Sequence, residues 1–444
     1  MINGMFSIQW HITSNCLHRC KHCYMFDENY EPYNCTYDDF YSMFLSISEF
    51  CNKYGFKDNY FLSGGSPLLN PDCENIINLL SSESKQIGIM DIPEMVTDDN
   101  IKILKKHNIY DFQLSFDGLQ STHDSIRGLG SFENTIKACK KLCENGFSLR
   151  IMFTVSKQNF SELIPLCNFL IENLNNFLFG YDFSVCIGNA SVLDGTFTQN
   201  EVNNLMDEYY HFVKNHKNTN NKRAVFSLKP TMYRVKYLDE INSNFNINGN
   251  YSHISGCYIG WSSICVTETG DVLPCRRLPI VIGNLKKESF ETIFLQSPIL
   301  KKYRRYSIYL DGCKSCNYSL ICKGCPAITF GLTGNSFDKF PYCDNSRKNK
   351  SGFDQTLLPS MDSSNEEELS LIKKTFNNQM LLGLNGVART NPKAFLAYSK
   401  IKQTNSINLF YNDPKMWQKE HGIELSYDDI LVIQQMGNSM CVST

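Results

Sequence analysis

The stretch MFSIQWHITSNCLHRCKHCY, residues 5–24, joins a predicted strand to a group of three cysteines. Its apolar, aromatic and β-branched residues are typical of a strand. Cys16, Cys20 and Cys23 follow as C-x3-C-x2-C. Three thiolates at this spacing can bind three irons of a 4Fe–4S cluster and leave the fourth iron open. The sequence therefore predicts a reactive iron–sulfur site directly after the first strand.

The cysteine content of the whole chain also favours metal binding. The 444 residues include 19 cysteines, whereas disulfide frameworks of such density belong to small secreted domains. A zinc site is the alternative for the first three cysteines. Zinc usually takes four ligands in paired C-x2-C units, and His18 or His22 would have to supply the fourth.

Short apolar strands alternate with helical stretches along the first 190 or so residues. Further strands are predicted at 59–65, 110–118 and 148–156, with helices between them that begin with 37–55. This alternation predicts an α/β fold with a parallel sheet and helices outside it. Functional groups of such folds gather at the C-terminal ends of the strands. The cysteine triad lies at such an end.

Overall composition excludes several classes of protein. The chain is 42% hydrophobic and 20% charged, and its net charge of −2 gives no footprint for nucleic acid or an anionic membrane. No apolar run reaches the roughly 20 residues that span a bilayer. The N-terminus lacks the pattern of a secretory signal. We therefore expect a cytoplasmic protein of two or three domains without nucleic-acid or membrane partners.

A second group of cysteines lies between residues 257 and 343. The segment TETGDVLPC (267–275) predicts a hairpin that brings its last cysteine back towards the first of the group. Seven thiolates exceed the need of one tetrahedral metal site, so two sites of about four ligands are expected, with two zinc ribbons as the alternative. The seven are Cys257, Cys275, Cys313, Cys316, Cys322, Cys325 and Cys343.

CLHRCKHCY (16–24) resembles the C-x3-C-x2-C-aromatic signature of the radical S-adenosylmethionine superfamily. The resemblance implies a partial (β/α)6 TIM-like barrel, here residues 1–250. It implies a 4Fe–4S cluster held by the triad, with S-adenosylmethionine on the open iron. It also implies reductive cleavage of that cofactor to a 5′-deoxyadenosyl radical, which abstracts hydrogen from the substrate.

Contacts to S-adenosylmethionine follow from the same resemblance. FLSGGSP (61–67) looks like the family's Gly-Gly-Glu-Pro segment, with Ser66 where Glu is usual. LSFDG (114–118) and HDSIRG (123–128) resemble the strand and loop of members that modify peptides. The implied contacts are Gly64 and Gly65 for the methionine amino group, Ser115 for the ribose and Arg150 for the carboxylate. Tyr24, the aromatic residue of the signature, is a further implied contact.

Residues 251–345 look like a SPASM domain, the auxiliary-cluster module of many radical enzymes that act on peptides. By this resemblance Cys257, Cys275 and Cys325 hold an inner 4Fe–4S cluster. An outer cluster is assigned to Cys313, Cys316, Cys322 and Cys343. The spacing from Cys322 to Cys325 is x2 where x3 is usual. Cys265 is either the fourth inner ligand or a buried strand cysteine, and in the second case the inner cluster has an open iron for a substrate thiolate.

The resemblance predicts a maturase with three 4Fe–4S clusters that makes a thioether or carbon–carbon crosslink in a ribosomally synthesised peptide. Formylglycine formation, as in anaerobic sulfatase maturases, is an alternative. Those enzymes place an aspartate base after the G-x4-C cysteine, where this chain has Arg276 and then Arg277. The sequence is also compatible with a radical enzyme acting on a small molecule and with a zinc-binding scaffold. No catalytic side chain is assigned.

Residues 346–444 form a third predicted segment, mostly helical, with an amphipathic stretch at 365–384. Many peptide maturases carry an N-terminal winged helix that binds the leader, whereas this chain begins almost at its first strand. The extension, or a separate leader-recognition protein, is therefore expected to bind the precursor. A flavodoxin or ferredoxin is the expected electron donor.

Overall fold

The computed structural model describes residues 5–26, 30–192, 196–216, 223–227, 257–305, 309–310, 324–343, 360–373 and 413–425, with a few single positions between 397 and 406. Cys313, Cys316 and Cys322 lie outside these residues, as does most of the predicted extension. No helix among the described residues combines the length and the apolar character needed to cross a bilayer.

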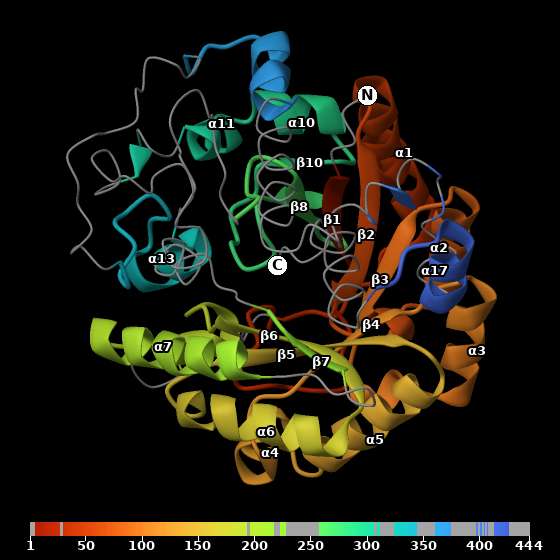
Figure 1. Ribbon diagram of the computed structural model, residues 1–444. Coiled ribbons are helices and arrows are strands. Elements are labelled where there is room, and N and C mark those ends of the chain that lie inside the picture. The colour runs from red at the N-terminus through yellow and green to blue at the C-terminus, as the bar shows by residue number, and fades with distance from the viewer. Residues whose placement is uncertain are drawn as a thin grey trace.

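The described residues form a ten-stranded sheet in which the first seven strands pair in chain order (Figure 1). All pairs from β1 to β7 are parallel. The predicted α/β fold with a parallel sheet is therefore confirmed. The strands are β1 Met5–Thr13, β2 Lys57–Gly64, β3 Gln86–Met90, β4 Asp111–Ser115, β5 Ser148–Val155, β6 Asn176–Phe183 and β7 Arg223–Phe226.

Helices follow the strands and cover the outer side of the curved sheet (Figure 1). They are α1 Tyr37–Tyr54, α2 Cys73–Ser82, α3 Asp98–Lys106, α4 Gln120–Arg127, α5 Ser131–Glu144, α6 Leu163–Asn173 and α7 Gln199–Asn215. Short 3-10 helices are η1 Pro67–Leu69, η2 Pro93–Met95, η3 Phe160–Glu162 and η4 Gly188–Val192. Local capping sets their ends: Thr36 accepts a hydrogen bond from the Asp39 amide at the start of α1, which ends at a left-handed Gly55.

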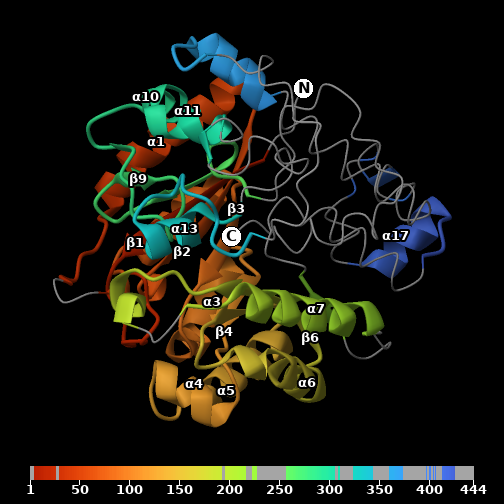
Figure 2. The same cartoon turned by 90° about the vertical axis from the view of Figure 1, so that its left-hand side faces the viewer.

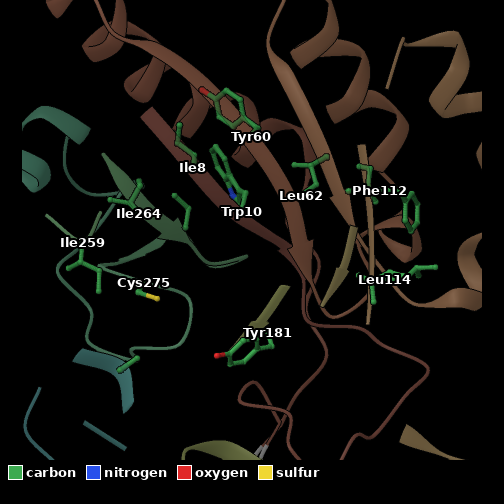
Figure 3. Close-up of a cluster of buried hydrophobic side chains, with 14 of the residues drawn as sticks. Ile8, Trp10, Tyr60, Leu62, Phe112, Leu114, Tyr181, Ile259, Ile264 and Cys275 are labelled. Carbon is green, nitrogen blue, oxygen red and sulfur yellow. The ribbon is translucent and has the colours of Figure 1, made fainter. Parts of the chain in front are cut away.

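Alternate residues of each strand face opposite sides of the sheet. On β1, the large apolar side chains of Phe6, Ile8, Trp10 and Ile12 are buried in the core under the helices. Figure 3 shows Ile8 and Trp10 in one cluster with residues of β2 and of the second cysteine region. The opposite side, which we call the lumen, is polar. From β1 it receives Ser7, Gln9, His11 and Thr13, all buried.

The second cysteine region continues the same sheet. Strand β8 (Ser263–Val266) pairs in parallel with β1, and Cys265 lies opposite Gln9 in this pairing. An antiparallel hairpin to β9 (Asp271–Leu273) turns at Gly270, whose φ is +91°, so the hairpin predicted at 267–275 is confirmed. β10 (Gly283–Asn284) closes this edge. The boundary predicted near 250 lies outside the described residues, but in space the sheet runs through both regions.

Further helices are α10 Phe290–Gln296, α11 Pro298–Arg304, α13 Pro326–Thr333 and α17 Pro414–His421. α10 packs beside α1, and α11 follows beside α10 (Figures 1 and 2). Residues 365–373 of the predicted extension are helical. Within that helix, Glu368 is fully buried and accepts hydrogen bonds from Arg304 and Arg305 at the end of α11.

Candidate active site

The cysteine triad occupies the loop between β1 and α1, at the C-terminal ends of the parallel strands. Residues that follow β6 donate hydrogen bonds to its backbone. The Asn189 amide donates to the carbonyls of Cys23 (3.0 Å) and Phe26 (2.7 Å). Gly188 has a φ of +56°, and a Cβ there would lie 2.8 Å from the Cys23 carbonyl. Only glycine fits this close approach.

A buried carboxylate, Asp117, ties the same loop to β4. His22, between two of the cysteines, bonds to Asp117 Oδ2 at 2.7 Å. Arg127 Nε donates to that oxygen, and Arg127 Nη1 lies 3.8 Å from Cys20 Sγ. The Thr154 amide donates to Oδ1 at 2.8 Å. Burial opposes the negative charge, but Arg127 and His22 outweigh it and hold the pKa of Asp117 well below its usual range.

His18 and Glu94 form an ion pair beside the triad. His18 Nε2 lies 2.9 Å from Glu94 Oε2. Burial alone would lower the pKa of His18, but hydrogen bonds to Cys20 and Glu94 raise it to about 9. Burial also raises the pKa of Cys16 and of Cys23 to about 11. These thiols are protonated without metal, so iron binding must displace protons.

The predicted glycine segment lies at the end of β2, against the cysteine loop. A Cβ on Gly64 would fall 2.1 Å from the Thr13 carbonyl oxygen, and one on Gly65 would fall 2.0 Å from that of Asn15. Contact with the triad's own loop therefore requires both glycines. Ser66 is buried and donates a 2.5 Å hydrogen bond to Asp91 Oδ1 at the end of β3.

Asp91 is a second buried carboxylate of this mouth. Its oxygens accept hydrogen bonds from the amides of Leu68 (3.0 Å) and Ile92 (2.7 Å). Burial raises its pKa to about 7, against the effect of these hydrogen bonds. Nothing in the sequence patterns singled out Asp91, because its role depends on the neighbouring strand.

The remaining predicted cofactor contacts divide into near and distant residues. Ser115 ends β4 and is half-buried at the mouth. Tyr24 directly follows the triad, and its hydroxyl lies 3.4 Å from His11 Nε2. Arg150 is instead near the start of β5, where it makes two hydrogen bonds of 2.6 and 2.7 Å to Asp111 at the start of β4. The structure does not bring Arg150 to the triad, and its assignment stays a prediction.

The residues present fit the groups that the triad implies. Three free thiols occupy one loop at the mouth, and the electrostatic influence of Cys20 and Cys23 reaches Cys16. Among the described residues, no three Cys, His, Asp or Glu side chains gather as ligands of a single metal ion do. Three thiols in one loop match the three protein ligands of a 4Fe–4S cluster that keeps one iron open.

Three of the predicted auxiliary ligands lie near Tyr303 of α11. Burial raises the pKa of the Tyr303 hydroxyl, and the nearby thiols of Cys257, Cys275 and Cys325 act in the same direction. Arg277 adds a donor 3.9 Å from Cys325 Sγ. Cys343 is half-buried at the end of its loop, and the other three predicted ligands lie outside the described residues. The division into two auxiliary clusters stays a prediction.

Cys265 connects the two cysteine regions through the lumen. Its buried Sγ lies 3.6 Å from His11 Nε2, the nitrogen that also meets Tyr24. Burial and the charge of Arg276 lower the pKa of His11 to about 3, so this imidazole is neutral. The sequence named Cys265 and Tyr24 but missed His11, whose position follows only from the pairing of β1 with β8.

Matches to family models cover two segments of the chain. Residues 10–170 match the radical SAM superfamily, and residues 257–326 match SPASM, an iron–sulfur cluster-binding domain. The first segment contains the triad. The second contains all the predicted auxiliary cysteines except Cys343, which lies beyond its end.

Similar proteins come from two functional groups. An AdoMet-dependent heme synthase of Methanosarcina barkeri is 25% identical, over 77% of this chain and 97% of its own length. The antilisterial bacteriocin subtilosin biosynthesis protein AlbA of Bacillus subtilis is 22% identical, over 75% of this chain and 69% of its own. The crystal structure of Streptococcus suis SuiB bound to its precursor peptide SuiA shares the fold, with a TM-score of 0.57 and 16% identity over 76% of this chain and 75% of that one.

Proposed function

Because the chain is a radical S-adenosylmethionine enzyme with a SPASM domain, we propose that it is a peptide maturase. Its product is a thioether or carbon–carbon crosslink in a ribosomally synthesised peptide. The observation that carries the proposal is the meeting of both cysteine regions at His11, which lies 3.4 Å from the Tyr24 hydroxyl and 3.6 Å from Cys265 Sγ. A substrate in the lumen is therefore next to both regions.

When bound, the triad's cluster and S-adenosylmethionine supply a 5′-deoxyadenosyl radical that removes hydrogen from the substrate. The chain's own residues position and shield this chemistry. Asp117, His22 and Arg127 orient the triad loop, and Gly64 with Gly65 lets the end of β2 approach it. Ser66 and Asp91 brace the same mouth by a 2.5 Å hydrogen bond.

Three 4Fe–4S clusters are part of the proposal. The gathering of Cys257, Cys275 and Cys325 around Tyr303 supports an inner auxiliary cluster. Contact of Cys265 with His11 supports its role as a lumen thiol beside that cluster. Cys257, Cys275 and Cys325 would then hold the inner cluster, which would offer a binding position for a substrate thiolate, an arrangement that suits thioether formation.

Peptide substrates are favoured by the relatives and by the extension. AlbA takes part in bacteriocin biosynthesis, and SuiB is solved with its precursor peptide. The heme synthase and AlbA cover similar shares of this chain, 77% and 75%, so coverage does not separate the two substrate classes. Part of the extension is anchored on α11 through Glu368, where we propose that it helps to bind the precursor, with or without a separate leader-recognition protein. A flavodoxin or ferredoxin is the proposed electron donor.

A small tetrapyrrole is the second candidate substrate, because heme synthases are among the relatives. Formylglycine formation is less well supported, since Arg276 stands after Cys275 where a base is needed. The zinc scaffold is set aside, because the chain is an enzyme of this superfamily.

Anaerobic reconstitution tests the proposal. We expect about twelve irons per chain, from three four-iron clusters, and 5′-deoxyadenosine after reduction with S-adenosylmethionine. A Cys16/Cys20/Cys23→Ala triple variant should lose all cleavage and keep its auxiliary iron. Mass spectrometry of candidate precursor peptides should show loss of two hydrogens per crosslink. Turnover of an iron tetrapyrrole, with no peptide modified, would favour the second candidate instead.

A further inference from the structure

Two adjacent arginines after Cys275 have different surroundings. Arg277 is paired: its Nη2 donates to Asp182 Oδ2 at 2.7 Å, and its Nη1 donates to the Phe183 carbonyl at 2.9 Å. These bonds join the second cysteine region to the end of β6. Arg277 therefore has a structural partner for its charge.

Arg276 has no such partner among the described residues. Its one hydrogen bond there runs from Nη1 to the Met90 thioether, at 3.4 Å. Its Nε is buried without an acceptor. A thioether is a weak acceptor and carries no charge, so the positive charge of Arg276 is not neutralised by any described carboxylate.

The guanidinium lies in the lumen, between the two cysteine regions. Gln9 of β1 also donates to the Met90 sulfur, at 3.6 Å, so Gln9 and Arg276 meet at the end of β3. The Arg276 charge acts on His11, Tyr24 and Cys265. Gln9 is 5% exposed, and its Oε1 is buried without a donor. Two unsatisfied polar groups thus border one part of the lumen.

An unpaired, partly buried charge is unfavourable unless an opposite charge joins it. The planar guanidinium fork suits a carboxylate, which can accept two of its N–H groups. We propose that Arg276 is a carboxylate-binding residue of the lumen and holds an acidic side chain of the substrate peptide beside His11 and Cys265. This inference rests on the proposed function, and it narrows the substrate to peptides with Asp or Glu near the modified residue.

The carboxylate has a second possible source, the methionine moiety of S-adenosylmethionine. The test therefore has two arms on the reconstituted full-length enzyme. One arm measures the Kd of S-adenosylmethionine. The other measures, with that cofactor present, the Kd of two blocked synthetic peptides, acetyl-Gly-Cys-Gly-Asp-Gly-amide and its Asn counterpart, which differ in their one carboxylate. Both arms use wild type, Arg276→Gln, Arg276→Lys and, as a surface-charge control, Lys286→Gln.

We expect wild type to bind the Asp peptide about tenfold more tightly than the Asn peptide, the size of a charge-assisted pair. Arg276→Gln should remove this preference and leave the cofactor Kd unchanged. Arg276→Lys should keep part of the preference for the Asp peptide, and Lys286→Gln should keep all of that preference. A tenfold weaker cofactor Kd in Arg276→Gln, without a peptide preference in wild type, overturns the substrate assignment and gives the carboxylate to the cofactor.

Equal binding of both peptides by wild type, with an unchanged cofactor Kd in Arg276→Gln, overturns carboxylate binding altogether. Iron content and melting temperature show whether each variant is folded. These Kd values do not require the enzyme to modify the peptide, so they are independent of turnover. Failure to modify any peptide would contradict the proposed function while leaving a measured carboxylate preference intact.

Discussion

Two buried carboxylates each bond to two basic side chains, but in different regions of the molecule. Asp117 joins His22 and Arg127 beneath the radical-cluster loop. Glu368 joins Arg304 and Arg305 between the extension and α11. Both carboxylates are fully buried, and only the first network reaches a cluster cysteine, Cys20. A buried carboxylate with two basic partners therefore positions the cysteine loop in one region and attaches the extension to α11 in the other.

The largest effect should come from Asp117→Asn. This change removes the charge that Arg127 and His22 share and frees the loop that holds Cys20. We expect a loss of about 3–5 kcal/mol in stability, typical of a broken buried ion pair, and a fall of at least about a hundredfold in 5′-deoxyadenosine formation, roughly 2.7 kcal/mol or more in activation free energy. Iron counting should show selective loss of the radical cluster, and unchanged iron and cleavage would contradict this role.

Glu368→Gln is the matched change in the other network. It leaves Arg304 and Arg305 buried without a carboxylate, so a similar loss of about 3–5 kcal/mol in unfolding free energy is expected. Cleavage of S-adenosylmethionine per folded molecule should stay close to wild type. Denaturant unfolding and single-turnover assays measure the two quantities. A fall in cleavage as large as that of Asp117→Asn would contradict the claim that only the Asp117 network supports cleavage of S-adenosylmethionine.

Arg127→Gln should have an intermediate effect. The guanidinium lies 3.8 Å from Cys20 Sγ, and a positive donor near a cluster sulfur stabilises the reduced state. Without it we expect a more negative reduction potential and cleavage slower by about tenfold with a protein donor. Arg127→Lys should restore part of the potential. Redox titration followed by electron paramagnetic resonance measures the shift, and an unchanged potential in both variants would limit Arg127 to a structural role.

The last prediction concerns the pH dependence of stability and not the cleavage reaction: the folded-state pKa of Asp91 is raised from 3.8 to about 7. The folded protein then binds more protons than the unfolded chain between these values, so this group lowers stability as pH rises from about 4 to 7, by up to about 1.4 kcal/mol per pH unit. Asp91→Asn should flatten the fall in melting temperature over this range. An unchanged pH profile would show that Asp91 does not titrate there.

Much of the site was predictable from the sequence because it depends on local spacing. The triad follows its strand as C-x3-C-x2-C, and the hairpin at 267–275 forms around Gly270 as its turn residues predict. Asp117 and Arg127 were inside the quoted motifs, but their roles were not assigned. Their partner His22 is 95 residues from Asp117 along the chain, and no local pattern connects them.

The placement of Arg150 depends on strand pairing, and its assignment to the cofactor stays a prediction. The resemblance assigned it to the cofactor, whereas the folded chain holds it against Asp111 at the start of the neighbouring strand. Register within a sheet, which depends on pairing between distant segments, sets how far along the barrel a side chain lies. A position in a motif does not specify that distance.

Strand–helix alternation was enough to predict the parallel sheet, because hydrophobic periodicity is written directly in the chain. The resemblance of the cysteine motif indicated the class of enzyme, and the cluster ligands that the cysteine spacing predicts stay a prediction. The folded structure was needed to pair β8 with β1, to bring His11 between Tyr24 and Cys265, and to separate a paired Arg277 from an unpaired Arg276. Such contacts join residues far apart in sequence. Their energies depend on burial and counter-charges that exist only once the strands have paired along the lumen.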